Sequence, residues 1–222
     1  MASASKKGGV VTRFRVPLVG DGMLVPCVDG RERPYVALDT AASTGVLESV
    51  LRRVEEFLPS YSGVHRGSGY KSHLSTDAYE SARDAALSFA GRDGRDDIAI
   101  ICRNTTEAIN HLAYRLRLRF DDVVVTSVVE HHSNLLPWSR AAACRFVECG
   151  PDGTFATADV VAELDRVPRA RLLAITGASN ITGWLPPIDE IIDAAHNRET
   201  GFPVGYGNSA SAPPRPPRSR QW

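Results

Sequence analysis

A short polar segment near the middle of the chain has residue types that suit anion binding. An apolar run, residues 98–102, is followed by Arg103, Asn104, Thr105, Thr106 and Glu107, which open an amphipathic stretch. Asn104 is a good helix N-cap, and we expect the Glu107 carboxylate to accept from the Asn104 N–H in a capping box. Thr105 and Thr106 then lie in the first helical turn with free hydroxyl groups. The segment predicts a site for a phosphorylated cofactor, because several backbone N–H groups point at one spot.

The helix dipole would favour an anion at this turn only modestly. It contributes about 0.3–1 kcal/mol, and up to about 2 kcal/mol in a partly buried site, before any direct hydrogen bond is counted. A well-capped helix without a ligand therefore remains the alternative at this point.

Two further polar segments follow apolar runs. Glu130-His131-His132-Ser133-Asn134 follows the run at 122–127, and a second segment at 177–184, which contains Asn180, follows the run at 171–176. The adjacent histidines point apart on a strand or turn, so we expect no two-histidine metal site. Two alternatives stay open: a histidine ring that stacks on or hydrogen-bonds a cofactor, or one exposed and one packed histidine. Asn180 is either a turn former or a ligand contact.

The elements that must position these segments alternate along the chain after residue 35. Alternating apolar runs and helical periodicities are typical of a mostly parallel sheet with helices on both faces. We expect strands at 98–102, 122–127, 144–149, 171–176 and 202–206, and helices at 46–58, 77–90, 105–119, 133–143, 157–166 and 187–198. Ligands bind outside the carboxyl ends of such strands, so the three polar segments are expected at one edge.

Composition narrows the class of protein. The 222 residues include 26 basic and 26 acidic side chains and are 43% hydrophobic, so nothing favours nucleic acid or a membrane as a partner. The N-terminus lacks a signal-peptide core, and we expect a cytoplasmic location. The four cysteines match no CxxC pair or zinc set and are expected to be free, mostly buried thiols. No GxGxxG follows a strand, so a dinucleotide has no fingerprint.

Several ordered motifs together resemble those of class V, fold-type I pyridoxal-phosphate enzymes, specifically the cysteine desulfurase and selenocysteine lyase group. The likeness covers about residues 35–200. It rests on Leu38-Asp39-Thr40-Ala41-Ala42-Ser43-Thr44, Val64-His65-Arg66-Gly67, Arg103-Asn104-Thr105-Thr106-Glu107-Ala108-Ile109-Asn110, Glu130-His131-His132-Ser133-Asn134-Leu135-Leu136-Pro137-Trp138, and Leu172-Leu173-Ala174-Ile175-Thr176 running into Ser179-Asn180.

The resemblance implies a fold, a cofactor and site residues. The fold is the α/β three-layer large domain of these enzymes, a mostly parallel sheet flanked by helices, in truncated form. The cofactor is pyridoxal 5′-phosphate, with Thr105 and Thr106 beside its phosphate, His131 stacked on its pyridine ring, and Asn180 near its phenolic oxygen and the substrate carboxylate. The segment with His65 and Arg66 would lie near the active-site mouth. The substrate of full-length relatives is an amino acid, and they are usually homodimers.

The resemblance breaks toward the C-terminus. Gly207 takes the place of the family's aspartate that pairs with the pyridine nitrogen, and no lysine follows Lys71 to form the Schiff base. We therefore expect an irregular segment at 1–35, an incomplete cofactor-binding domain at 36–204 and a Pro/Arg-rich tail at 205–222, left by truncation or a frameshift; a natural disordered tail is the alternative. The chain is expected to be inactive alone, or else to be a non-catalytic phosphate- or cofactor-binding protein.

Overall fold

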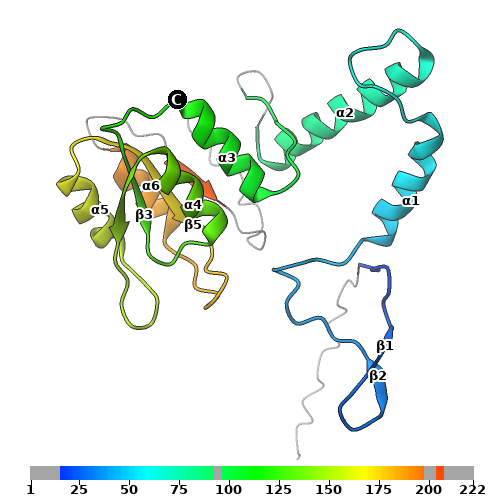
Figure 1. The fold of residues 1–222 in the computed structure, drawn as a ribbon, viewed down its shortest axis with the longest axis horizontal. Helices are drawn as coiled ribbons and strands as arrows, with labels where there is room; N and C mark the ends of the chain where they lie inside the picture. The colour runs from blue at the N-terminus through cyan, green and yellow to red at the C-terminus, as the bar shows by residue number, and fades with distance from the viewer. Residues whose placement is uncertain (1–15, 93–96, 198–203, 208–222) are drawn as a thin grey trace, which may run out of the picture. The chain divides into compact units, whose positions relative to one another are not determined.

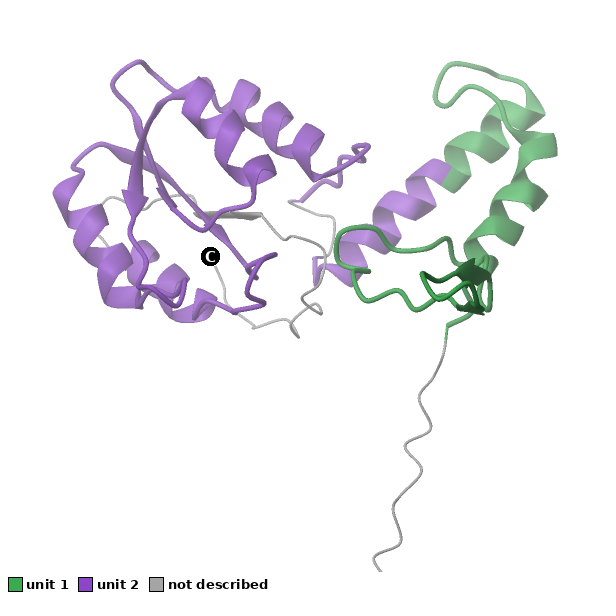
Figure 2. Cartoon of the chain, turned by 60° about the horizontal axis from the view of Figure 1, so that its bottom comes forward, with its two compact units in different colours: residues 1–78 green, residues 79–222 purple. Residues whose placement is uncertain are grey.

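The computed structural model describes residues 16–92, 97–197 and 204–207. The chain divides into two compact units, residues 1–78 and 79–222, which are coloured separately in Figure 2. One helix, α2 (Tyr70–Phe89), begins in the first unit and ends in the second.

The first unit contains little sheet. A short antiparallel hairpin joins β1 (Leu24–Pro26) to β2 (Glu32–Pro34), within the segment expected to be irregular. The Cys27 N–H donates to the Arg31 carbonyl and closes the turn. Next come α1 (Glu48–Phe57) and the 3₁₀ helix η1 (Leu58–Ser60).

Hydroxyl groups on α2 hold the loop that precedes this helix. The buried Ser72 donates to the Gly63 carbonyl at 2.6 Å and accepts from the Gly67 N–H at 3.1 Å, and Ser75 accepts from the Ser62 N–H. α2 begins seven residues before the predicted start at 77. The apolar pattern does not indicate this first part of the helix, because the buried residues there are serines. The loop is tied to the helix by polar bonds that a hydrophobic pattern does not report.

The second unit is built around a four-stranded, fully parallel sheet (Figure 1). The strands are β3 (Val123–Ser127), β4 (Ala143–Val147), β5 (Ala170–Thr176) and β6 (Val204–Gly207), in the order β4-β3-β5-β6. Four helices accompany them: α3 (Thr105–Leu116), α4 (His132–Ala141), α5 (Thr157–Arg166) and α6 (Ile188–His196). The predicted parallel sheet with alternating helices is confirmed.

Two hydrophobic clusters form the two sides of this sheet. Ile109 and Ala113 of α3 and Trp138 of α4 pack with Val124 and Leu172 on one face. The other face buries, from α5, α6 and three strands, Val160, Leu164, Ile191, Ala195, Val125, Val147, Leu173 and Ile175. Successive strand residues alternate between the clusters, as a pleated strand with helices on both faces requires. The predicted three-layer arrangement is therefore present.

The strand predicted at 98–102 is wrong. These residues join no strand in the described chain, and the side chains of Ile98, Ile100 and Ile101 are 72%, 60% and 54% exposed. An apolar, β-branched run favours a strand only where a neighbouring strand pairs with it, and no described strand does so here. Of the strand predicted at 202–206, residues 202 and 203 lie outside the described residues. Within the described ranges, no helix has both the length and the apolar character needed to cross a bilayer.

Candidate functional site

The N-terminus of α3 presents an ordered set of hydrogen-bond donors. Asn104 has an extended backbone, and its side chain accepts from the Glu107 N–H at 2.9 Å, so the predicted N-cap is confirmed. Thr105 and Thr106 follow with exposed side chains. Among the described residues, no hydrogen bond involves their hydroxyl groups or their backbone N–H groups. Two N–H groups and two hydroxyls at one helix start are thus available to an oxyanion.

The predicted capping box is wrong in one partner. The Glu107 carboxylate accepts from the N–H of Arg103, at 2.6 Å, where the Asn104 N–H was expected. The Arg103 guanidinium also donates to Glu107 at 2.9 and 3.1 Å. These side-chain and backbone hydrogen bonds from Arg103 lower the pKa of the Glu107 carboxyl. The carboxylate beside the donor set is paired with a cation, which reduces its repulsion of a second anion.

His131 caps the next helix. Its Nδ1 atom accepts from the Ser133 N–H at 3.1 Å and lies 2.7 Å from the Ser133 hydroxyl. Because the backbone donor assigns Nδ1 as an acceptor, the neutral ring carries its proton on Nε2. His131 and His132 are both exposed, with ring centroids 6.3 Å apart, so the reading of one exposed and one packed histidine is wrong. The ring of His131 is held by its cap and has a face open to solvent.

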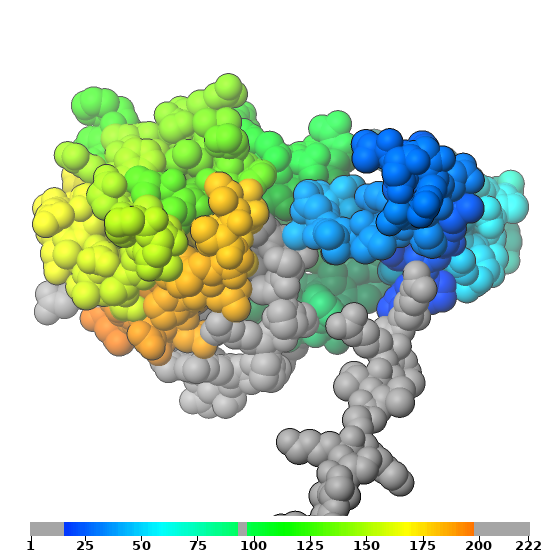
Figure 3. Space-filling model, turned by 90° about the horizontal axis from the view of Figure 1, so that it is seen from below, coloured from blue at the N-terminus to red at the C-terminus, as the bar shows by residue number. Residues whose placement is uncertain are grey.

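The loop after β5 is wound into a turn around Ser179. The buried Ser179 hydroxyl accepts from the N–H groups of Ile181 and Thr182 at 3.3 and 3.2 Å, and the Gly183 N–H donates to the Ser179 carbonyl. Asn180 stands exposed at the tip of this turn, and no hydrogen bond of its side chain is present within the described residues. This loop forms part of the surface visible in orange in Figure 3.

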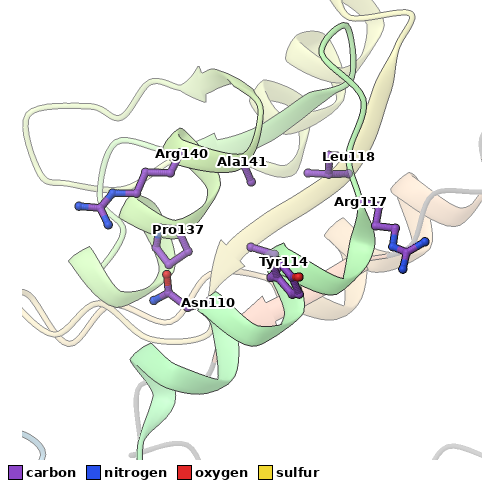
Figure 4. Close-up of a pocket in the computed structure, with 8 residues that line it drawn as sticks. Asn110, Tyr114, Arg117, Leu118, Pro137, Arg140 and Ala141 are labelled. Carbon is purple, nitrogen blue, oxygen red and sulfur yellow. The ribbon is translucent and has the colours of Figure 1, made fainter.

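The topology brings these three segments to one edge of the sheet. β3 and β5 are parallel neighbours, so the loops that carry His131 and Asn180 leave the sheet side by side (Figure 1). α3 leads into β3, and it packs beside α4 with both helices running the same way, since Asn110 lies near Pro137 and Leu118 near Ala141 (Figure 4). The N-termini of both helices therefore lie at the carboxyl edge, where parallel α/β sheets bind ligands.

A buried carboxylate that sequence reasoning missed links two of these segments. Glu130 is 9% exposed, and its Oε1 accepts from the Ser127 hydroxyl at 2.8 Å and from the Thr176 N–H at 2.7 Å. Its Oε2 accepts from Asn134 Nδ2 at 2.8 Å, and Asn134 Oδ1 accepts from Trp138 Nε1 at 3.2 Å. Burial raises the pKa of Glu130, against the lowering effect of these hydrogen bonds. The spacing of Glu130, Asn134 and Trp138, four residues apart, was the signal available in the sequence.

The two residues expected near the active-site mouth belong to the first unit. His65 and Arg66 are exposed in the first unit, where the His65 N–H donates to the Thr76 hydroxyl at 3.0 Å and His65 adopts a positive φ of 61°.

All four cysteines are free and half-buried, less buried than expected. In the described ranges, no three His, Cys, Asp or Glu side chains gather as a metal site would require.

A pocket of about 320 Å³ lies between α3 and α4. Figure 4 shows Arg117 and Arg140 at its two ends, with guanidinium groups that point away from each other. None of the predicted site residues lines it. Without converging charges, this pocket does not compete with the carboxyl edge as a candidate site.

The chain matches a family of known proteins. Residues 36–205 match the family model described as aminotransferase class-V. A cysteine desulfurase of Dickeya dadantii is 36% identical over 173 residues, which cover 74% of this chain and 41% of that protein. A cysteine desulfurase of Haloferax volcanii is 30% identical over 197 residues, covering 85% and 45%. The matched part of the chain thus spans less than half the length of either relative.

Solved structures agree with the fold. The apo structure of a cysteine desulfurase from Thermococcus onnurineus aligns with a TM-score of 0.65 and 27% identity, over 75% of this chain and 42% of that one. A cysteine desulfurase from Escherichia coli aligns with a TM-score of 0.57 and 31% identity, over 76% and 43%. A more distant structure, 16% identical with a TM-score of 0.65 over 78% and 46%, is a mutant lyase with glycine covalently linked to its pyridoxal-phosphate cofactor.

Proposed function

Because the chain belongs to the class-V aminotransferase family, we propose that the carboxyl edge of its sheet holds pyridoxal 5′-phosphate. The observation that carries the proposal is the donor set at the start of α3. The N–H and hydroxyl groups of Thr105 and Thr106 have no partner within the described residues, and they lie at the same sheet edge as His131 and Asn180. A phosphate is the anion that such a helix start suits best.

Each residue has a distinct task in this proposal. Thr105 and Thr106 bind the phosphate, and the exposed ring of His131 stacks on the pyridine ring. Asn180 donates from its side-chain amide to the phenolic oxygen or to the carboxylate of an amino-acid substrate. When bound, the cofactor supplies an electron sink for bond cleavage at the α-carbon of that amino acid.

The substrate and the reaction are proposed from the relatives. Those reported above are cysteine desulfurases, and we propose cysteine as the amino acid whose sulfur the complete fold removes. No lysine follows Lys71 in the 222 residues, so these residues alone supply none for covalent attachment at the family position. The chain alone is therefore proposed to hold the cofactor without a covalent bond and without turnover. A homodimer and a cytoplasmic location are proposed on the family resemblance. No observation favours the alternative of a protein that uses the donor set for a different phosphate ligand.

The test is a ligand titration followed by NMR shifts, with pyridoxal phosphate and inorganic phosphate measured separately. A few charge-assisted hydrogen bonds, less the entropy of association, predict a dissociation constant of about 0.1–1 mM for either ligand. Removal of both hydroxyls, by Thr105→Ala with Thr106→Ala, should weaken both ligands clearly. Thr157→Ala is the matched control, because Thr157 begins α5 on the other face of the sheet and bonds Glu190 there.

His131 separates ring stacking from helix capping. His131→Ala removes both the ring and the cap acceptor, whereas His131→Asn removes the ring and keeps a side chain that caps helices well. Both variants should bind pyridoxal phosphate more weakly and inorganic phosphate nearly as well as the parent chain. The site assignment is wrong if the double threonine variant binds like the parent, or if His131→Asn weakens both ligands equally.

A further inference from the structure

The structure assigns a positioning role to Glu130: its buried carboxylate fixes the loop that carries His131 against the loop that carries Asn180. This inference rests on the proposed function, because it concerns how the two sides of that cofactor site keep their spacing. Glu130 acts through other residues in this inference, because its carboxylate accepts from Ser127, Asn134 and Thr176 of the chain itself.

The carboxylate reaches both loops with separate oxygen atoms. Oε1 accepts from the Thr176 N–H, and the Thr176 hydroxyl donates to the Ala178 carbonyl at 2.8 Å, immediately before the Ser179 turn that displays Asn180. Oε2 accepts from Asn134, whose own N–H donates to the His131 carbonyl at 2.8 Å. One side chain therefore bridges two segments that are 46 residues apart.

Every member of this network is buried, so water cannot replace a lost bond. Ser127, Asn134, Trp138 and Thr176 are 0%, 5%, 2% and 2% exposed. Glu130 accepts three hydrogen bonds and donates none, while Asn134 donates to it and accepts from Trp138. The donors and acceptors thus fit in one direction only. A buried donor left without an acceptor carries its full desolvation cost, which makes the arrangement specific.

This direction supplies a sharp test. In Glu130→Gln, the oxygen of the new side-chain amide can still accept from Ser127 and Thr176, but its NH₂ group then faces the Asn134 amide, donor against donor. If the Asn134 side-chain amide rotates by half a turn, its NH₂ group faces the Trp138 N–H, which is again donor against donor. The double variant Glu130→Gln with Asn134→Asp restores every bond, because the introduced aspartate accepts both from the introduced glutamine and from Trp138. Glu148→Gln, at an exposed glutamate just after β4, is the matched control.

Pyridoxal phosphate and inorganic phosphate report on different parts of the site. We expect Glu130→Gln to weaken pyridoxal phosphate about tenfold and inorganic phosphate less than about twofold, because the α3 donors do not depend on Glu130. The double variant should regain most of the lost affinity, and Glu148→Gln should bind like the parent. Equal weakening of both ligands, or a double variant that stays as weak as Glu130→Gln, would overturn the positioning role.

The backbone amide NMR signals test the inference without any ligand. If the parent chain fails to bind pyridoxal phosphate, only the proposed function is refuted, and these signals still report on the role of Glu130. In Glu130→Gln, the signals of residues 131–133 and 177–183 should shift together, those of Thr105 and Thr106 should stay, and the double variant should return the shifted signals. Ser127→Ala, which removes one donor and keeps the other two, should give smaller shifts at the same residues. Shifts confined to one loop would overturn the inference.

Discussion

The N-cap of α3 is a single hydrogen bond on which the proposed phosphate site depends, and Asn104→Ala removes it. The Asn104 side chain accepts from the Glu107 N–H at 2.9 Å, and alanine offers no acceptor in its place. Loss of such a cap costs about 1 kcal/mol, within a range of about 0.5–2 kcal/mol. The Glu107 carboxylate does not replace this acceptor, because it already accepts from the N–H and the guanidinium of Arg103.

The assay is equilibrium unfolding in urea, followed by circular dichroism. At a slope of about 2 kcal/mol per molar urea, a loss of about 1 kcal/mol lowers the midpoint by about 0.5 M. Asn104→Gly is the matched control, because glycine is tolerated at an N-cap and should cost only a few tenths of a kcal/mol. Inorganic phosphate should also bind more weakly to Asn104→Ala, since the cap orders the N–H groups of Thr105 and Thr106.

Two results would refute this reasoning. Equal midpoints for Asn104→Ala and Asn104→Gly would mean that the side-chain bond contributes nothing. A normal phosphate affinity in a clearly destabilised Asn104→Ala chain would mean that the anion does not bind at the start of α3, since the two effects share one cause.

The other predictions concern charge, packing and cofactor attachment. Burial raises the pKa of Glu130 in the folded chain, so the folded state binds this proton more tightly than the unfolded state does. The stabilisation that comes from this proton is present below the ordinary pKa and is lost as the pH rises through the raised value. The unfolding free energy of the parent, measured in urea at several pH values, should therefore fall relative to that of Glu130→Gln from acid to neutral pH, and a relative gain would contradict the raised pKa. Leu173→Ala, at a fully buried site in β5, should cost about 2–5 kcal/mol in the same assay, whereas a loss below about 1 kcal/mol would contradict the packing. Borohydride reduction of the chain mixed with pyridoxal phosphate should leave no stoichiometric adduct by mass spectrometry. An adduct on Lys71, together with sulfide release from cysteine, would contradict the proposal that the chain alone does not turn over.

Most of the second unit could be predicted because its signals are local. In the helix predicted at 187–198, the spacing of Ile188, Ile191, Ile192 and Ala195 places these residues on one face of α6, and Ile191 and Ala195 are buried. The strands β3 and β5 are apolar on both faces, which is the pattern of a strand covered by helices on both sides. Periodicity is sufficient where each element buries a continuous apolar surface.

The features that sequence reasoning missed depend on partners far away in the chain. Residues 98–102 have the composition of a strand, but a strand exists only where another strand accepts its hydrogen bonds. The early start of α2 depends on buried serines that bond the preceding loop, and no apolar pattern marks such residues. In both cases the residue types are compatible with the structure but do not specify it.

The candidate site combines both kinds of information. Asn104, Thr105 and Thr106 could be assigned from adjacent residues, because a helix start is defined within one turn. The link between the His131 and Asn180 loops could not, because the Thr176 N–H that donates to Glu130 belongs to a different strand, and only the parallel pairing of β3 and β5 brings it within 2.7 Å. A buried glutamate at the end of a strand, followed by asparagine and tryptophan at successive helical turns, becomes informative once that pairing is known. Substitutions at Glu130 should therefore act on the distance between the loops, whereas substitutions at Thr105 and Thr106 should act on the anion itself.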